Sequence, residues 1–147
     1  MSRFFISNQT LAIVLGLGSL FTACSTISKF DQYAYTQTTS LKVDALAIMK
    51  HATESYPLHQ QEVQQVQTAI SKMYEYEKNR PKNAITKKMW SVLTDSTGNL
   101  YGGFIKRWEN EGTLDTAFIR ISQDLISQSF DQISQLESGK IKTSQTN

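Results

Sequence analysis

Two His-x-x-Glu units are the residues of this chain whose types and spacing could do chemistry. His51 and Glu54 form the first unit, and His59 and Glu62 form the second. Residues three apart share one face of a helix, so each unit places an imidazole beside a carboxylate. If the units converge at a helix corner, they could bind zinc or iron. If they do not, His51 in a last helical turn and Glu62 in a first turn simply complement two helix dipoles.

We expect the second arrangement, solvated helix ends without a bound metal or other cofactor. Carboxylate-bridged di-iron bundles use the order Glu-x-x-His, and here the order is reversed. Other catalytic patterns are missing from the sequence. It has no Gly-x-Ser-x-Gly elbow, and Gly102-Gly103 lacks the lysine and the spacing of a phosphate-binding loop. The sequence therefore predicts a protein that is not an enzyme.

Cys24 is the only cysteine in a chain of 147 residues, so it cannot form an internal disulfide. It follows an apolar run from Leu11 to Phe21 and the small residues Thr22 and Ala23, and Arg3 is the only charged side chain before it. A weakly positive start, an apolar segment and a small-residue cleavage site are typical of a secretory signal.

This segment resembles the signal peptide of a bacterial lipoprotein precursor. Thr22, Ala23 and Cys24 match the lipobox of that family, while Phe21 stands where leucine is usual. The resemblance implies that residues 1–23 are removed and that Cys24 carries lipid on its sulfur and its new amine. Ser25 then favours the periplasmic face of the outer membrane. An ordinary cleaved signal and an uncleaved anchor are the alternatives, although the apolar run is short for a hydrocarbon layer of about 30 Å.

The rest of the chain has the length and composition of one small domain. The full sequence is 39% hydrophobic and 19% charged, and its formal net charge of +2 gives no drive toward nucleic acid. We expect a lipidated tether at 24–29, a folded domain at 30–139 and a flexible polar tail at 140–147.

Apolar residues in the folded domain recur with helical spacing, and nothing alternates strictly as a strand would. Long helical segments with short breaks favour an all-α, antiparallel bundle of about four main helices plus one short helix. The expected helices are 30–52, 58–79, one between Asn83 and Asp95, a short one at 104–112, and a last one from 113 or 114 to 138. The apolar side of the last helix is expected to comprise Leu114, Phe118, Ile121, Leu125, Ile126, Phe130, Ile133 and Leu136.

A basic run follows the second expected helix. Between positions 78 and 88 it holds five positive charges and no acid, namely Lys78, Arg80, Lys82, Lys87 and Lys88. We expect a solvated loop between helices. The alternative is that these cations face anionic lipid headgroups or an acidic partner.

Aromatic residues crowd around the glycine-rich break near position 100. Trp90, Tyr101, Phe104 and Trp108 are spaced as the apolar side of short helices would be. We expect them to pack in the core, and the alternative is that they line a ligand groove.

Taken together, these patterns predict a lipid-anchored bacterial envelope protein that binds another protein without catalysis. Its expected partners are the membrane, through the lipid, and an envelope protein, and not nucleic acid. The glutamine-rich face of the 58–79 helix and the basic run are the first surfaces to consider. The second hypothesis is a small-ligand or cell-wall-binding lipoprotein that uses the aromatic region Trp90–Trp108. The third is a metal-dependent enzyme at the His51/His59 corner.

Overall fold

The computed structural model describes residues 29–139, and this part of the chain is helical with no strand. The all-α prediction is therefore confirmed. The predicted signal peptide, the lipidation of Cys24 and the polar tail at 140–147 lie outside the described residues. The elements in chain order are α2 (Gln32–Met49), the 3₁₀ helix η1 (Lys50–Thr53), α3 (Tyr56–Lys78), α4 (Ala84–Thr94), α5 (Tyr101–Glu111) and α6 (Thr116–Glu137).

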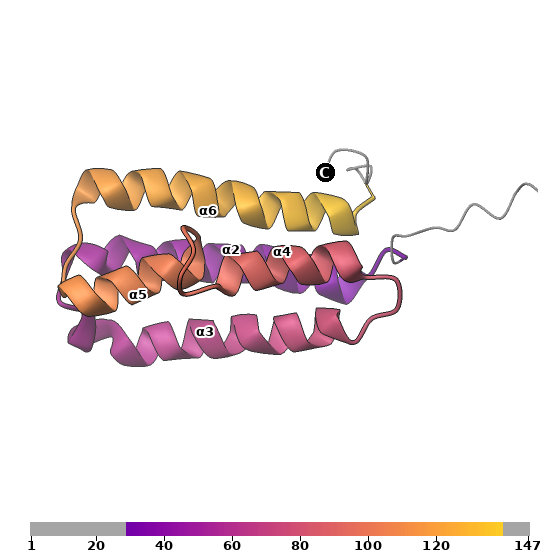
Figure 1. The fold of residues 1–147 in the computed structure, drawn as a ribbon, viewed down its shortest axis with the longest axis horizontal. Helices are drawn as coiled ribbons and strands as arrows, with labels where there is room; N and C mark the ends of the chain where they lie inside the picture. The colour runs from indigo at the N-terminus through magenta and orange to yellow at the C-terminus, as the bar shows by residue number, and fades with distance from the viewer. Residues whose placement is uncertain (1–28, 140–147) are drawn as a thin grey trace, which may run out of the picture.

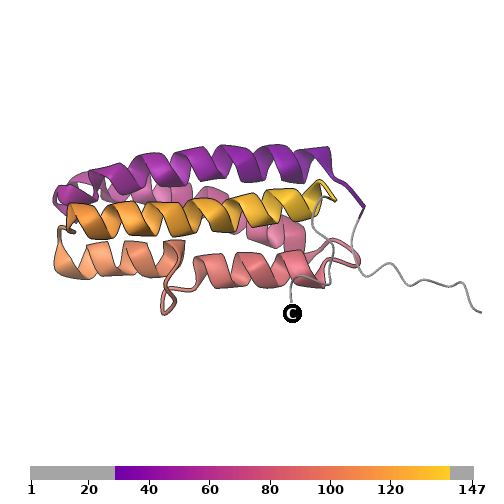
Figure 2. The same ribbon diagram turned by 90° about the horizontal axis from the view of Figure 1, so that it is seen from above.

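The helices form an antiparallel bundle of four rods (Figures 1 and 2). Helices α4 and α5 follow one another in the same direction and together make the third rod, while α2, α3 and α6 are unbroken. Helix α2 packs against both α3 and α6. The start of α2 and the α3–α4 loop lie at one end of the bundle, and the α2–α3 connection, which includes η1, lies at the other (Figure 1). None of the helices at 29–139 combines the length and hydropathy that a membrane-crossing segment requires.

The core follows the predicted helical stripes. Helix α2 buries Ala34, Thr38, Leu41, Ala45 and Ile48 at the expected alternating spacing of four and three. Helix α3 buries Val63, Ile70, Met73 and Glu77 on its seam. Each fully buried aliphatic or aromatic side chain contributes about 1.5–3 kcal/mol, so these stripes fix which face of each rod points inward.

One predicted stripe is wrong in part. Ile121 is 63% exposed and Leu125 is 45% exposed, whereas Ile119 and Ser122 face the core. The apolar sector of α6 is wider than its contact with the bundle, so a row of apolar residues remains on the flank of the helix. Sequence periodicity alone does not distinguish this flanking row from the buried one.

The break between α4 and α5 is built from a polar turn and two glycines. The Asp95 carboxylate accepts hydrogen bonds from the backbone N–H and the hydroxyl of Thr97, at 2.8 and 2.7 Å. A Cβ atom at Gly102 would overlap the backbone of Thr94, and one at Gly103 would overlap the carbonyl of Gly98. The first turn of α5 can therefore lie directly on the end of α4 only because these positions lack side chains.

Candidate functional site

The structure brings three of the four predicted metal-binding candidates together at one corner of the bundle. His51 lies in η1, Glu54 is the residue at which η1 ends, and His59 lies in the first turns of α3. One ligand atom from each of the three lies within 4.8 Å of the other two. Glu54 and Ser55 have extended backbone angles, which turn the chain so that the two helical segments face each other.

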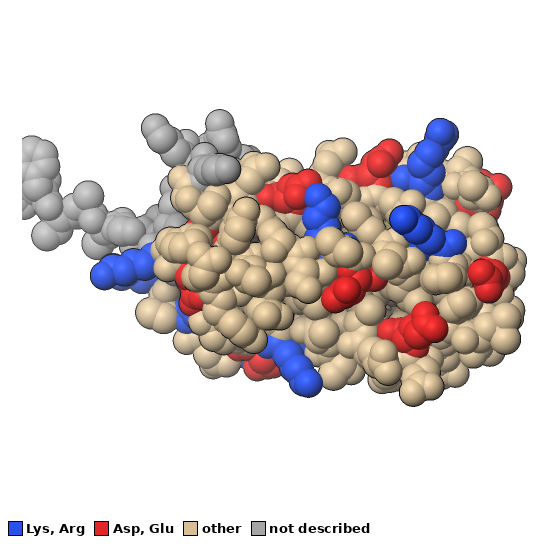
Figure 3. Space-filling model, turned by 180° about the vertical axis from the view of Figure 1, so that it is seen from behind, with Lys and Arg blue, Asp and Glu red and all other residues tan. Residues whose placement is uncertain are grey.

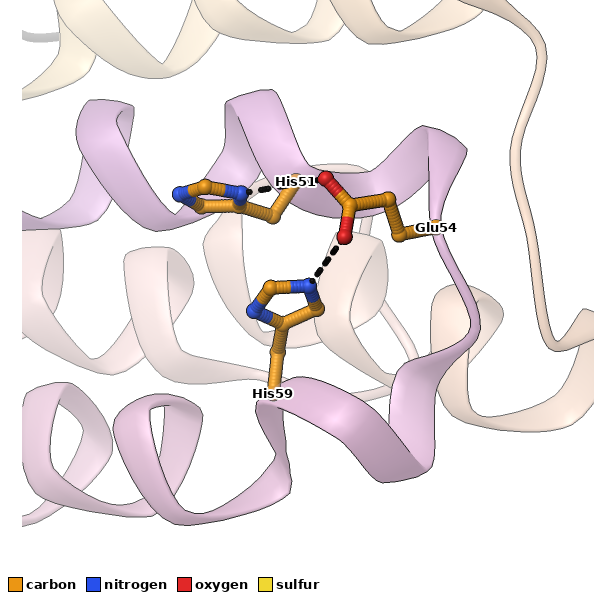
Figure 4. A group of neighbouring side chains, drawn as sticks. All are labelled: His51, Glu54 and His59. Carbon is orange, nitrogen blue, oxygen red and sulfur yellow. Dashed lines mark hydrogen bonds and ion pairs between the residues drawn. The ribbon is translucent and has the colours of Figure 1, made fainter.

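The Glu54 carboxylate lies beside the two imidazoles and bridges them (Figure 4). One oxygen is 3.5 Å from His51 Nδ1, and the other is 3.0 Å from His59 Nε2. The imidazole rings stack with their centroids 4.5 Å apart and an interplanar angle of 22°. The hydrogen bonds with His59 and, to a lesser extent, His51 lower the pKa of the Glu54 carboxyl below its ordinary value. The carboxylate is therefore ionised at neutral pH.

Trp108 of α5 supports this corner from the core side. Its indole ring lies 5.8 Å from the His59 ring, and its Nε1–H donates a 3.0 Å hydrogen bond to the Glu54 carbonyl. Two backbone hydrogen bonds also hold the corner, from Tyr56 to Gly112 and from Leu114 to Ala52. The backbone that carries Glu54 is thereby fixed to the start of α6 and to α5.

The two imidazoles differ in burial. The His51 side chain is half exposed, whereas His59 is only 9% exposed. The Nδ1 atom of His59 is buried and makes no hydrogen bond within residues 29–139, and it lies 3.7 Å from a Glu62 carboxylate oxygen. The prediction of solvated helix ends therefore describes His51 and Glu62, which are exposed, but it is wrong for His59. That burial depends on Trp108, which is far away in the sequence.

The aromatic candidates are almost completely buried. Trp90, Tyr101 and Trp108 are each at most 1% exposed. Trp90 packs edge-to-face on Phe130, with ring centroids 6.0 Å apart, and burial raises the pKa of the Tyr101 hydroxyl. These side chains therefore pack in the core, as expected.

Arg80 does not belong to a solvated basic loop, which corrects one part of that prediction. Its guanidinium is largely buried and contacts two buried acids: Nη1 lies 2.9 Å from Glu77 and 2.8 Å from Glu137. Its Nη2 donates a 2.8 Å hydrogen bond to the carbonyl of Lys29. Burial and then the charge of Glu137 raise the pKa of the Glu77 carboxyl. The sequence did contain a sign of this network, because Glu77 lies on the apolar face of α3. A buried carboxylate requires a partner.

The other cations of the basic run are exposed. Lys78 pairs with Glu75 at 3.0 Å on the surface of α3. Lys82, Lys87 and Lys88 are also exposed, and no ion pair involving them occurs in the part of the chain that the structure describes.

Two of the hollows on the bundle surface bear on the candidate binding surfaces. A polar one of about 710 Å³ follows the predicted glutamine-rich face of α3, with Gln60, Gln61, Gln64 and Gln65 among its lining residues. The other, of about 380 Å³, is an apolar groove between α4 and α6 that sequence reasoning missed. It is lined by Ala84, Ile85, Lys88, Met89, Val92, Leu100, Ser129, Gln132 and Ile133.

The face over α2, on the opposite side from the view of Figure 1, has a different character. Lysines and arginines alternate there with aspartates and glutamates, and no large area carries one sign of charge (Figure 3). Lys42 and Asp131 form one of the ion pairs between α2 and α6, at 2.6 Å. Most of the charges on such a face are solvated, and each exposed pair contributes at most about 1 kcal/mol.

The protein is thus an all-α bundle of four rods, with a His–Glu–His corner at one end and an apolar groove between α4 and α6. No family model, curated protein or solved structure matches this chain.

Proposed function

We propose that this protein is a lipid-anchored component of the bacterial cell envelope that binds another protein without catalysis, through the groove between α4 and α6. The observation that carries the proposal is the apolar lining of this groove, which Ile85, Met89 and Val92 of α4 and Ile133 of α6 share. The anchor is a proposal as well, and it is supported by the lipobox that ends at Cys24.

The groove continues into a larger apolar surface. Val92 on the α4 side is 47% exposed. Ile121, Leu125, Ser129 and Gln132 recur at spacings of four, four and three, so they share one face of α6. Because Ser129 and Gln132 line the groove, the exposed Ile121 and Leu125 extend its α6 wall. Contiguous exposed apolar surface of this kind marks sites of protein interaction.

The occupant that fits best is an amphipathic helix with an acidic residue at its edge. Helices α4 and α6 lie side by side and form the two walls of the groove, which is the geometry in which a helix binds by its apolar face. Lys88 lies in the lining and Lys87 is its neighbour, and neither is neutralised by an acid of residues 29–139. A carboxylate on the partner would pair with these ammonium groups and fix the register of the bound helix.

The proposed anchor would hold this groove close to the membrane. The Lys29 carbonyl is hydrogen-bonded to Arg80 beside the α3–α4 loop, and α4 begins directly after that loop. Lys29 is five positions after Cys24, and a fully extended chain spans at most about 3.6 Å per residue, or roughly 18 Å. The end of the bundle at which α4 begins would therefore lie near the bilayer surface, and a membrane-associated partner could reach it.

Site-specific photocrosslinking in native envelopes tests the binding surface. A photoreactive residue at Val92 should yield a discrete adduct, and the crosslinked peptide should map to an acidic amphipathic helix of another protein. Val43, an exposed valine on α2, provides the matched control and should yield no such adduct. Equal adducts at both positions, no adduct at Val92, or an adduct with a second copy of this chain would each refute the proposed groove function.

The anchor is tested separately. Intact-mass analysis of the membrane-extracted protein should show an acylated chain that begins at Cys24, and Cys24→Ser should release the protein from the membrane fraction. An unmodified thiol would refute the anchor while leaving the groove experiment interpretable, because Val92 can be tested in either form.

A further inference from the structure

We propose that His51, Glu54 and His59 form a binding site for a divalent transition-metal ion of the zinc type, with water completing the coordination. This site is separate from the α4–α6 groove and does not depend on the function proposed for it. The juxtaposition of two imidazole nitrogens and one carboxylate at the η1–α3 corner carries the inference.

The donor set selects the class of ion. Imidazole nitrogens and carboxylate oxygens are the usual ligands of Zn²⁺, at about 2.0–2.2 Å, and three protein ligands commonly leave a fourth position to water. Copper and nickel accept the same donors. Calcium and magnesium prefer sites made entirely of oxygen, so two imidazoles disfavour them.

The geometry is close to what one ion requires. Two ligands about 2.1 Å from the same tetrahedral ion lie roughly 3.4 Å apart, and the three donor atoms here already lie within 4.8 Å of one another. Small rotations of His51 and Glu54 would close this difference. Both side chains are about half exposed, which leaves room for these rotations.

The third ligand is held in place before any ion binds. His59 is buried against the Trp108 ring, and Trp108 also fixes the Glu54 backbone through its indole N–H. Rigid support of this kind is what a metal site needs from the residues behind its ligands.

A second, independent observation concerns the far side of the His59 ring. Its Nδ1 is buried and makes no hydrogen bond with any of residues 29–139, although a Glu62 carboxylate oxygen lies 3.7 Å away. A buried ring nitrogen without a hydrogen-bond partner is costly. When Nε2 binds a metal, the proton resides on Nδ1, which would then face the Glu62 carboxylate. A carboxylate behind a coordinating histidine is the usual supporting partner of a zinc ligand.

The alternative is a hydrogen-bonded cluster in which the Glu54 carboxylate alone joins the two imidazoles. Isothermal titration of the chelator-treated protein with zinc chloride separates the two. We expect one ion per chain, and His51→Ala and Glu54→Gln should each weaken binding at least tenfold. Glu109→Gln is the matched control, because Glu109 is equally exposed and pairs with a cation, Lys106, at 3.0 Å. It should bind zinc as the unmodified protein does.

Both test variants change exposed side chains, so circular dichroism melts should show that they remain folded. Copper(II) provides a local readout, because a bound copper ion quenches nearby tryptophan emission and Trp108 lies beside His59. Quenching should saturate at one equivalent, be reversed by excess zinc and be lost in His51→Ala. Absence of zinc binding, or zinc affinity and quenching that persist in His51→Ala, would overturn the proposal.

Discussion

Replacing Arg80 by alanine would measure how strongly the bundle depends on one largely buried cation. The guanidinium pairs with Glu77, which is fully buried, and with Glu137, which is 4% exposed, and it ties the Lys29 carbonyl to the same end of the bundle. Its removal would leave two buried carboxylates without a counter-charge. Breaking a buried pair in this way costs about 3–5 kcal/mol, a large share of the roughly 5–15 kcal/mol that stabilises a typical domain.

Urea unfolding followed by circular dichroism is the appropriate assay. With a slope of about 1–3 kcal/mol per molar urea, the midpoint should fall by at least about 1 M. Lys78→Ala is the matched control, because Lys78 is two residues away and its pair with Glu75 is exposed. Such a surface pair contributes about 0–1 kcal/mol. Equal midpoints for the two variants would refute the assignment of Arg80 to a buried network.

The pH dependence of Arg80→Ala provides a second check on the same reasoning. The pKa of Glu77 is already raised by burial and by Glu137, and Arg80 opposes that rise. Without Arg80 the pKa of Glu77 in the folded state should rise further. A folded-state pKa above the unfolded one gives stability at low pH that is lost as pH rises through the folded pKa. The difference in free energy of unfolding between Arg80→Ala and the unmodified protein should therefore become smaller as the pH is lowered from 8 to 5. A difference that stays constant or grows would contradict the carboxylate explanation.

Three further changes test other parts of the structure. Gly103→Ala should destabilise the bundle by about 1–3 kcal/mol, because the added Cβ would overlap the carbonyl of Gly98, whereas Gly98→Ala meets only ordinary contacts and should have little effect in the same urea assay. Asp31 has its pKa lowered, chiefly by a hydrogen bond from the Tyr76 hydroxyl. The stability that the ionised Asp31 contributes is therefore present above its unfolded pKa and is lost as the pH falls through its folded pKa. The free energy of unfolding should decrease less between pH 6 and pH 2 in Asp31→Asn than in the unmodified protein. Trp108→Ala should cost about 3–5 kcal/mol by thermal or urea unfolding, because the indole is fully buried.

The architecture was predictable because helical periodicity reports burial directly. Ala34, Leu41 and Ile48 recur at the spacing that one helix face requires, and all three are buried. The turn at 95–99 also has a purely local cause, since the Asp95 carboxylate caps the backbone two residues ahead. Features determined by neighbours in the sequence were therefore accessible without the structure.

Features determined by contacts between distant segments were not accessible in this way. Arg80 was expected in a solvated loop because its neighbours in sequence are lysines, yet its partners include Glu137, on another rod. Ile121 was expected in the core because it is apolar and correctly spaced for a flank of the stripe. The positions of α2 and α4, which both pack against α6, decide which row of α6 is covered. No local pattern contains that information.

The His–Glu–His corner depends on both kinds of determinant. The turn after η1 places His51, Glu54 and His59 side by side, and the spacing of these residues suggested this possibility. The glycine break that allows α5 to follow α4 delivers Trp108 to the same corner, where its indole N–H holds the Glu54 carbonyl. An aromatic residue that sequence analysis treated as part of a separate cluster thus buries one imidazole and fixes the backbone of the carboxylate.

If zinc binds there, Trp108→Phe should weaken binding even though no zinc ligand is changed, because the ring is largely kept while the hydrogen bond that positions Glu54 is lost. Unchanged zinc affinity in a folded Trp108→Phe variant would show that the turn alone positions the ligands.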